Sequence, residues 1–153
     1  MLKDFLYLKE KNLKDVIELL LKSYTSSFSD SEPTLKRNSL GKAHHRLIIL
    51  VDNKPGIRVT EILNCLKITK QSLNRVIQDL IKKNLISLEK GEKDGREKKI
   101  YLTNKGIEFG HSLFSSQKSR ILNAFKKSSP DEVLYFKNVL KRIIEWKKKK
   151  NTY

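Results

Sequence analysis

The sequence predicts a mainly α-helical protein with one small β-hairpin, and three observations support this prediction. Apolar residues recur at intervals of three and four along most of the chain, which is typical of amphipathic helices. Two strand-like runs, 85–88 and 99–102, flank a charged turn that contains Gly91 and Gly95. A short helix and a longer helix, joined by a tight turn, are expected directly before the hairpin. Helix, turn, helix and hairpin in this order predict a winged helix-turn-helix core.

Two amphipathic helices are expected before this core. The apolar residues that define the first one are Leu13, Val16, Ile17, Leu20 and Tyr24. The Ser-rich stretch 23–38, which contains Pro33, predicts a loop or a loose helix end. A second helix is expected over about 40–52, and the Pro55-Gly56 pair marks the turn that follows it.

The helix-turn-helix is expected to consist of a short helix over about 59–65 and a longer helix over about 69–84. Their apolar stripes, predicted to be buried, are Val59, Ile62, Leu63 and Leu66 in the first and Leu73, Val76, Ile77, Leu80 and Ile81 in the second. Arg58 stands where a capping Ser or Thr is usual, so the first cap is weak and Arg58 is available to a phosphate. Thr69 is expected to cap the longer helix.

Two further helices are expected after the hairpin. Thr103 is placed to cap a long helix over about 104–127. The run Ser129-Pro130-Asp131-Glu132 combines an N-cap, a first-turn proline and the acidic residue of a capping box. It predicts a last helix that extends to about Lys149.

Composition limits the partners. The 153 residues carry a formal net charge of +16, which favours a polyanionic partner, although a Lys-rich genome would also raise this charge. No apolar run is long enough to span a bilayer, and the first residues lack a signal-peptide layout. Cys65 is the single cysteine, so no intrachain disulfide can form and a cytoplasmic location without membrane attachment is expected.

The outer face of the longer helix carries the side chains that reach base edges and phosphates. In a helix-turn-helix, the N-terminal residues of the second helix enter the major groove. Gln and Asn pair with adenine, Arg and Lys with guanine, and free N–H groups at a helix start suit a phosphate. The alternative is an ordinary solvated helix face. The candidate DNA-binding residues here are Thr69, Lys70, Gln71, Ser72, Asn74, Arg75 and Gln78.

The hairpin tip adds a second set of candidates. A narrow minor groove attracts inserted Arg or Lys, and Arg96 is the natural residue for this contact. Asp94 would repel phosphate, so its expected role is to orient Arg96 by a charged hydrogen bond. Lys93 and Lys98 complete the candidate set. The alternative is a solvated turn, since charged hairpin tips are common.

The ordered motifs over Leu40 to Gly106 resemble the bacterial MarR-type winged-helix regulators. The matching pieces are Pro55-Gly56, Thr60-Glu61-Ile62-Leu63, Ile68 to Leu73 with Arg75, Leu80 through Lys83-Asn84-Leu85-Ile86, Asp94-Gly95-Arg96 and Leu102-Thr103-Asn104-Lys105-Gly106. Asn84 replaces the usual Gly at the helix end, which is acceptable because Asn tolerates left-handed geometry. Gly95 replaces a frequent Arg and removes one cation from the wing. The resemblance implies a homodimer that represses or activates genes through a near-palindromic operator.

The terminal helices fit this implied dimer, because they offer more apolar surface than one winged helix can cover. The alternative is that these helices pack only within their own chain. The residues expected at the dimer interface are Leu13, Ile17, Leu20, Phe114, Ile121, Phe125, Phe136, Leu140, Ile143 and Ile144. The expected parts are an N-terminal dimerisation helix and loop over 1–39, the winged helix-turn-helix DNA-binding domain over 40–103, and C-terminal dimerisation helices over 104–153.

Effectors of the resembling family often bind between the DNA-binding lobe and the dimer helices. Four residues of this chain could approach that region, although a surface or core role is the alternative for each: His44, His45, Arg46 and His111. His44 and His45 point to different helix faces, so they do not form a metal pair, and no metal or cofactor is expected.

The sequence therefore predicts a dimeric transcriptional regulator that binds double-stranded DNA. Whether a small-molecule effector exists is left open. No P-loop, Gly-x-Ser-x-Gly or His-Glu-x-x-His motif occurs, so an enzyme is not expected. Two alternatives are a nucleoid protein with little sequence preference and a protein-interaction module built on a winged helix.

Overall fold

The computed structural model describes residues 5–91 and 97–145, and it confirms the mainly helical fold with a small antiparallel sheet. Residues up to Gln117 form one compact unit, and residues from Lys118 onward form a second. The elements in chain order are η2 (Leu6–Leu8), α1 (Glu10–Arg37), α2 (Lys42–Asn53), β1 (Ile57–Arg58), α3 (Val59–Leu66), α4 (Lys70–Lys82), β2 (Ile86–Lys90), β3 (Lys98–Leu102), α5 (Asn104–Lys126) and α6 (Pro130–Glu145).

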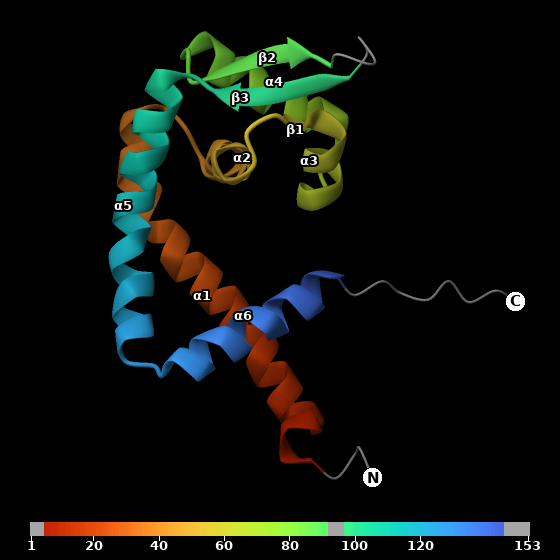
Figure 1. The fold of residues 1–153 in the computed structure, drawn as a ribbon, viewed down its shortest axis with the longest axis vertical. Coiled ribbons are helices and arrows are strands. Elements are labelled where there is room, and N and C mark those ends of the chain that lie inside the picture. Colours follow the sequence, from red (N-terminus) through yellow and green to blue (C-terminus); the bar gives the residue numbers. More distant parts are fainter. Residues whose placement is uncertain (1–4, 92–96, 146–153) are drawn as a thin grey trace, which may run out of the picture. The chain divides into compact units, whose positions relative to one another are not determined.

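The sheet has three antiparallel strands in the order β1-β3-β2, and it packs against α2, α3 and α4 (Figure 1). β2 and β3 form the expected hairpin, with Leu88 opposite Ile100. β1 was not expected from the sequence. It is only two residues long, and it joins the sheet because Ile57 pairs with Ile100 from the other side.

The hydrophobic core of the first unit lies between the sheet and these three helices. The stripe predicted for α4 is confirmed, since Leu73, Val76, Ile77 and Leu80 are buried. In α3 the stripe is confirmed for Ile62, which is fully buried, while the other residues of the stripe are partly buried against the core. The helix-turn-helix is therefore held by apolar contacts on one face, which leaves its other face to solvent.

α1 corrects the prediction of a loop over 23–38, because one helix continues to Arg37 with Pro33 inside it. A proline inside a helix costs about 3 kcal/mol. Phe28 and Leu35 are 4 % and 0 % exposed, and burying each stabilises the fold by about 1.5–3 kcal/mol. Pro33 itself is exposed. Tertiary burial on one face therefore outweighs the helix-breaking composition of this stretch.

The predicted helix starts are confirmed by their hydrogen bonds. Thr103 Oγ1 accepts from the backbone N–H of Gly106 at 3.0 Å and donates to the Asn84 carbonyl at 2.7 Å, which fixes the start of α5 against β2. Gly106 is needed there, because a Cβ would lie 1.9 Å from the Leu85 carbonyl oxygen. Asn84 adopts φ 55°, the left-handed geometry expected of it.

The second unit contains the C-terminal end of α5 and the whole of α6. Ser129 and Glu132 form the predicted capping box, with N···O distances of 2.7 and 3.2 Å. The backbone N–H of Ser129 lowers the pKa of the Glu132 carboxyl. The predicted end of the last helix near Lys149 lies outside the described residues. Among the helices of residues 5–91 and 97–145, none is long and apolar enough to cross a membrane.

Candidate nucleic-acid interface

The outer face of α4 brings together most of the residues that the sequence singled out for DNA. Thr69 caps the helix, since its Oγ1 accepts from the Ser72 backbone N–H at 3.1 Å. The candidate residues on this helix are all exposed, and the face forms an open depression. The residues that line this depression are Lys70, Gln71, Asn74, Arg75, Gln78, Asp79 and Lys82.

The depression combines the chemistry that reads and holds DNA. Its amides can pair with adenine edges, its guanidinium with guanine, and its ammonium groups with phosphate. Asp79 and Lys82 belong to this face although the sequence analysis did not name them. Their position could have been found from helical spacing, because residues 71, 75, 79 and 82 follow one another at intervals of three and four.

The hairpin is only partly described. Lys98 begins β3, is exposed, and lies opposite Lys90 of β2. Lys93, Asp94 and Arg96 lie outside the described residues, so the minor-groove contact stays a prediction. The two strands therefore carry a pair of cations at the end next to the turn, which favours a nearby anion.

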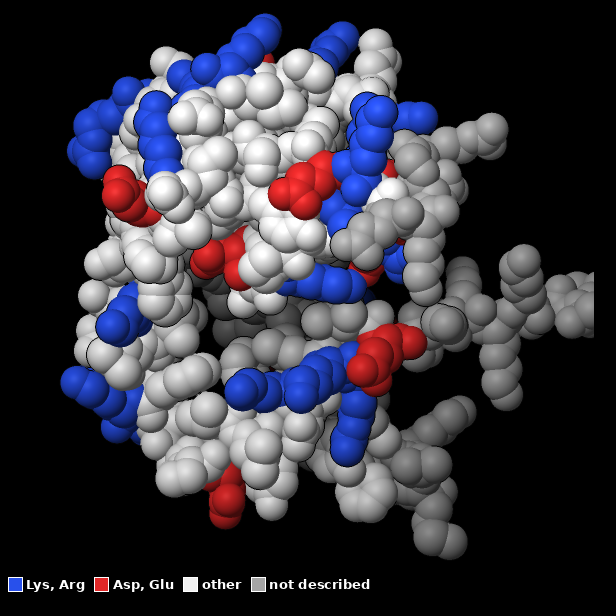
Figure 2. Space-filling model, turned by 45° about the horizontal axis from the view of Figure 1, so that its top comes forward, with Lys and Arg blue, Asp and Glu red and all other residues white. Residues whose placement is uncertain are grey.

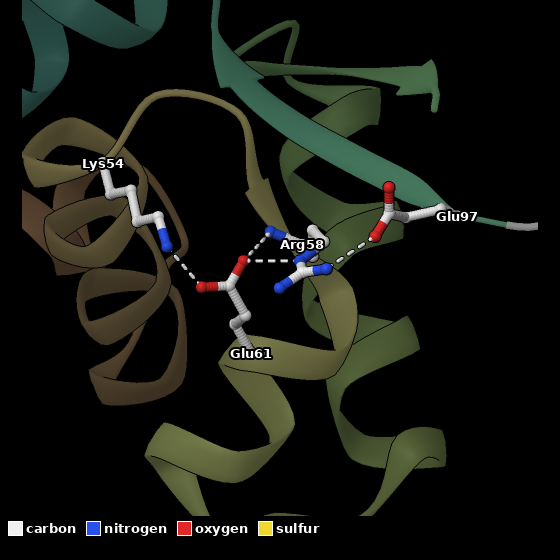
Figure 3. Close-up of polar contacts among 4 residues, drawn as sticks. All are labelled: Lys54, Arg58, Glu61 and Glu97. Atoms are coloured by element: carbon white, nitrogen blue, oxygen red, sulfur yellow. Dashed lines mark hydrogen bonds and ion pairs between the residues drawn. The ribbon is translucent and has the colours of Figure 1, made fainter. Parts of the chain in front are cut away.

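A chain of four charged side chains, Lys54, Glu61, Arg58 and Glu97, joins the end of α2, the start of α3 and the turn end of the hairpin (Figure 3). Arg58 Nε donates to Glu61 Oε1 at 2.9 Å, and Arg58 Nη1 donates to Glu97 Oε1 at 3.0 Å. Lys54 Nζ donates to the other oxygen of Glu61. The Lys54 ammonium and the Arg58 guanidinium lower the pKa of Glu61 to about 2. The two carboxylates raise the pKa of Arg58.

These contacts revise the expected role of Arg58. The predicted weakness of the cap is confirmed, since the Arg58 side chain accepts no helix N–H. The side chain of Glu61, in the first turn of α3, instead binds back to the cap residue, because Glu61 Oε1 accepts from the Arg58 backbone N–H at 3.3 Å. Arg58 is therefore held by two carboxylates rather than left as an unpaired cation facing a phosphate.

The four candidate effector residues separate into different environments. His45 is buried, Arg46 is partly buried, His44 is directed toward α4, and His111 is exposed on α5. Within the described residues, no hydrogen bond joins His111 to His45. The sequence could place these residues on helices, but it could not determine which of them meet.

His45 lies in a buried polar network inside the first unit. Its Nε2 lies 3.3 Å from Ser31 Oγ and 3.1 Å from Gln117 Oε1. The Ser31 hydroxyl donates to the Phe28 carbonyl, and the Gln117 amide donates to the Ser27 carbonyl, so both groups accept from His45. This assigns the ring proton to Nε2 and leaves Nδ1 as a buried acceptor without a partner in the described chain. Burial lowers the pKa of His45, and the Gln117 hydrogen bond opposes this shift.

The predicted dimer residues expose much of their apolar surface in the single chain. In the first unit, Ile17 is 67 % and Phe114 is 58 % exposed. In the second unit, Phe136 is 51 % and Ile144 is 81 % exposed. Leu13, Ile121 and Ile143 are also exposed, while Leu20, Phe125 and Leu140 are half-buried.

Figure 2 shows that Lys and Arg spread over the face drawn there, with acidic side chains in fewer places.

Comparison with known proteins identifies this arrangement. Residues 39–97 match the MarR family. The HTH-type transcriptional regulator PetP of Rhodobacter capsulatus is 34 % identical over 140 residues, which cover 92 % of this chain and 84 % of that protein.

Two solved structures share the fold. A MarR-family transcriptional regulator from Silicibacter pomeroyi superposes with a TM-score of 0.75 at 16 % identity, over 92 % of this chain and 94 % of that one. NadR in complex with 4-hydroxyphenylacetate superposes with a TM-score of 0.76 at 18 % identity, over 84 % and 91 %. The family match and the relative agree with the motifs of the helix-turn-helix and hairpin, and this chain is a member of the MarR family of helix-turn-helix transcriptional regulators.

Proposed function

We propose that this regulator acts as a homodimer on a near-palindromic operator in double-stranded DNA, as a repressor or an activator. The exposed outer face of α4 is the observation that supports it, because amide, guanidinium and ammonium groups line one open depression. Two α4 helices related by two-fold symmetry would enter successive major grooves, with half-site centres about 10 bp apart. A DNA partner also supports a cytoplasmic location.

Base discrimination is assigned to the first turns of α4. Gln71, Asn74 and Arg75 line the depression and Ser72 is exposed on the same helix, while Thr69 and Lys70 at the helix start suit phosphate. Lysines that contact phosphate release counterions, so operator affinity should fall steeply as salt is raised. The hairpin supplies Lys98 and, beyond the described residues, Lys93, Asp94 and Arg96.

Selection of bound sequences from random duplex DNA tests the proposal, followed by salt titration on the selected operator and on a scrambled duplex. We expect an inverted repeat and a clear preference for it. Equal affinity for both duplexes would favour the nucleoid alternative. No binding even at low salt would favour a protein-interaction module.

Arg75→Ala then tests the assigned face. If Arg75 contacts a guanine edge, operator binding should weaken by about 1–3 kcal/mol while scrambled DNA loses much less. Arg37→Ala is the matched control, because it removes the same charge from the exposed end of α1. Equal losses on both duplexes would make Arg75 a phosphate contact instead.

We further propose that a small molecule regulates the protein at the buried His45 network. Its Nδ1 is a buried acceptor without a partner within the described chain, so a ligand that offers a hydrogen-bond donor would satisfy it. NadR, which shares the fold, was solved with 4-hydroxyphenylacetate, a molecule with a hydroxyl and a carboxylate. A ligand would regulate only by binding one spacing of the α4 helices better than another. Calorimetric titration with 4-hydroxyphenylacetate, on the protein and on His45→Gln, tests this site.

A further inference from the structure

The DNA-facing surface of α4 contains one carboxylate, that of Asp79, beside Arg75 and Lys82. An acidic group on this face repels phosphate. Asp79 also follows Arg75 by one helical turn, a spacing at which opposite charges pair on a helix surface. Left unrestrained, the carboxylate would therefore compete with DNA for the guanidinium that the proposed function assigns to base contact.

His44 of α2 holds this carboxylate from the other side. Its Nε2 lies 3.2 Å from Asp79 Oδ2, and its side chain is 16 % exposed while that of Asp79 is 50 % exposed. The opposite ring nitrogen, Nδ1, accepts from the Gly41 backbone N–H at 3.1 Å. Because a backbone N–H can only donate, Nδ1 is unprotonated, and the ring proton sits on Nε2 and points at Asp79.

We infer that His44 is a positioning residue for DNA binding: it keeps the Asp79 carboxylate turned toward α2 and leaves Arg75 available to the duplex. This inference rests on the proposed function and concerns the same face of α4. Among residues 5–91 and 97–145, the Asp79 carboxylate is hydrogen-bonded to His44 and forms no salt bridge with Arg75, Lys82 or Lys83, although all three lie three or four residues away in the sequence.

The Asp79 carboxylate binds His44 in preference to the nearby Arg and Lys side chains because the imidazole is preorganised. It is anchored by the backbone N–H of Gly41, the N-cap of α2, and largely buried, so its bond to Asp79 costs little side-chain entropy. An Arg75 or Lys82 side chain must immobilise several torsions on an exposed surface to make the same bond. The α2 start and the DNA-facing helix are thereby connected through one imidazole.

Operator affinity of His44→Ala, Asp79→Asn and the double variant tests this inference. In His44→Ala the released carboxylate pairs with Arg75 or faces phosphate. An exposed pair at this spacing changes affinity about two-fold per helix, which is about four-fold for a dimer with two helices. In the double variant the carboxylate is gone, so affinity should return to that of Asp79→Asn. In His44→Gln the amide can accept from Gly41 and donate to Asp79, so affinity should stay at the wild-type level.

Rescue separates this role from simple packing. If His44 only supports the fold, Asp79→Asn cannot restore affinity, and the double variant will bind as weakly as His44→Ala. That result, or wild-type affinity in His44→Ala, would overturn the inference. Asp52→Asn, which removes an exposed carboxylate near the other end of α2, is the matched control and should not rescue His44→Ala. Wild-type protein that binds no duplex would instead refute the proposed function.

Discussion

The winged-helix core and the terminal helices use the same apolar pattern with opposite results. In the core, Leu47, Ile62 and Leu80 are each 0 % exposed. In α6 no residue within Pro130–Glu145 is buried, and Ile144 is 81 % exposed. The N-terminal half of α1 resembles α6, with Ile17 67 % exposed. The core thus satisfies its apolar surface within one chain, whereas the terminal helices leave theirs exposed, and in the proposed homodimer a second copy of the chain would cover it.

Charged substitutions in α6 are expected to have the largest effect. Phe136→Asp with Ile144→Asp places four carboxylates at the proposed interface of a dimer, where desolvating them opposes association. The mass in solution should fall from dimer to monomer, and operator affinity should drop by about 10²–10⁴-fold because the second half-site is no longer tethered. Light scattering and an operator titration measure both.

The matched control is Phe136→Leu with Ile144→Leu, which retains apolar side chains and should remain dimeric. A monomeric wild type at micromolar concentration would contradict the assignment. It would mean that the exposed faces pack within their own chain.

A truncation in the core should act on stability instead of assembly. Leu47→Ala removes a fully buried side chain from α2 and should lower the free energy of unfolding by about 2–5 kcal/mol. Ile49→Ala, two residues further on the same helix, truncates a side chain that is 38 % exposed and should cost about 1 kcal/mol or less. Urea unfolding of both variants measures the difference. Equal losses would mean that the two faces of α2 are not separated as described.

The sequence predicted what depends on local spacing and missed what depends on tertiary partners. The stripe of α4, the Thr69 and Thr103 caps and the Ser129 box all follow from neighbours within four residues. The helix through Pro33 could not be predicted, because it is stabilised by Phe28 and Leu35 against distant parts of the chain.

The same limit applies to the candidate site. Exposed residues on α4 could be placed from periodicity alone. The partners of Arg58 and His44 could not, because Glu97 and Asp79 lie 39 and 35 positions away in the sequence. The sequence therefore could not show that Arg58 is paired with carboxylates, or that the Asp79 carboxylate is bound by His44.

The smallest expected effect concerns His45, which lies where the core meets α1 and α5. Burial lowers the pKa of His45, so the native ring stays neutral under conditions in which the unfolded chain, with a pKa near 6.5, begins to bind a proton. Stability contributed by this group is therefore complete above about pH 6.5. It is lost as pH falls below that value, until the native pKa is reached.

One group changes the free energy of unfolding by at most about 1.4 kcal/mol per pH unit, so the test compares slopes. Urea unfolding between pH 7.5 and pH 5 should show a smaller loss for His45→Gln than for the wild type, because glutamine retains the donor to Ser31 and Gln117 but does not titrate. His111→Gln removes an exposed ring and should keep the wild-type slope. Parallel curves for wild type and His45→Gln would mean that the ring accepts a proton as readily inside the protein as in the unfolded chain. The unpartnered Nδ1 would then have an acceptor nearby, and the effector site proposed there would lose its support.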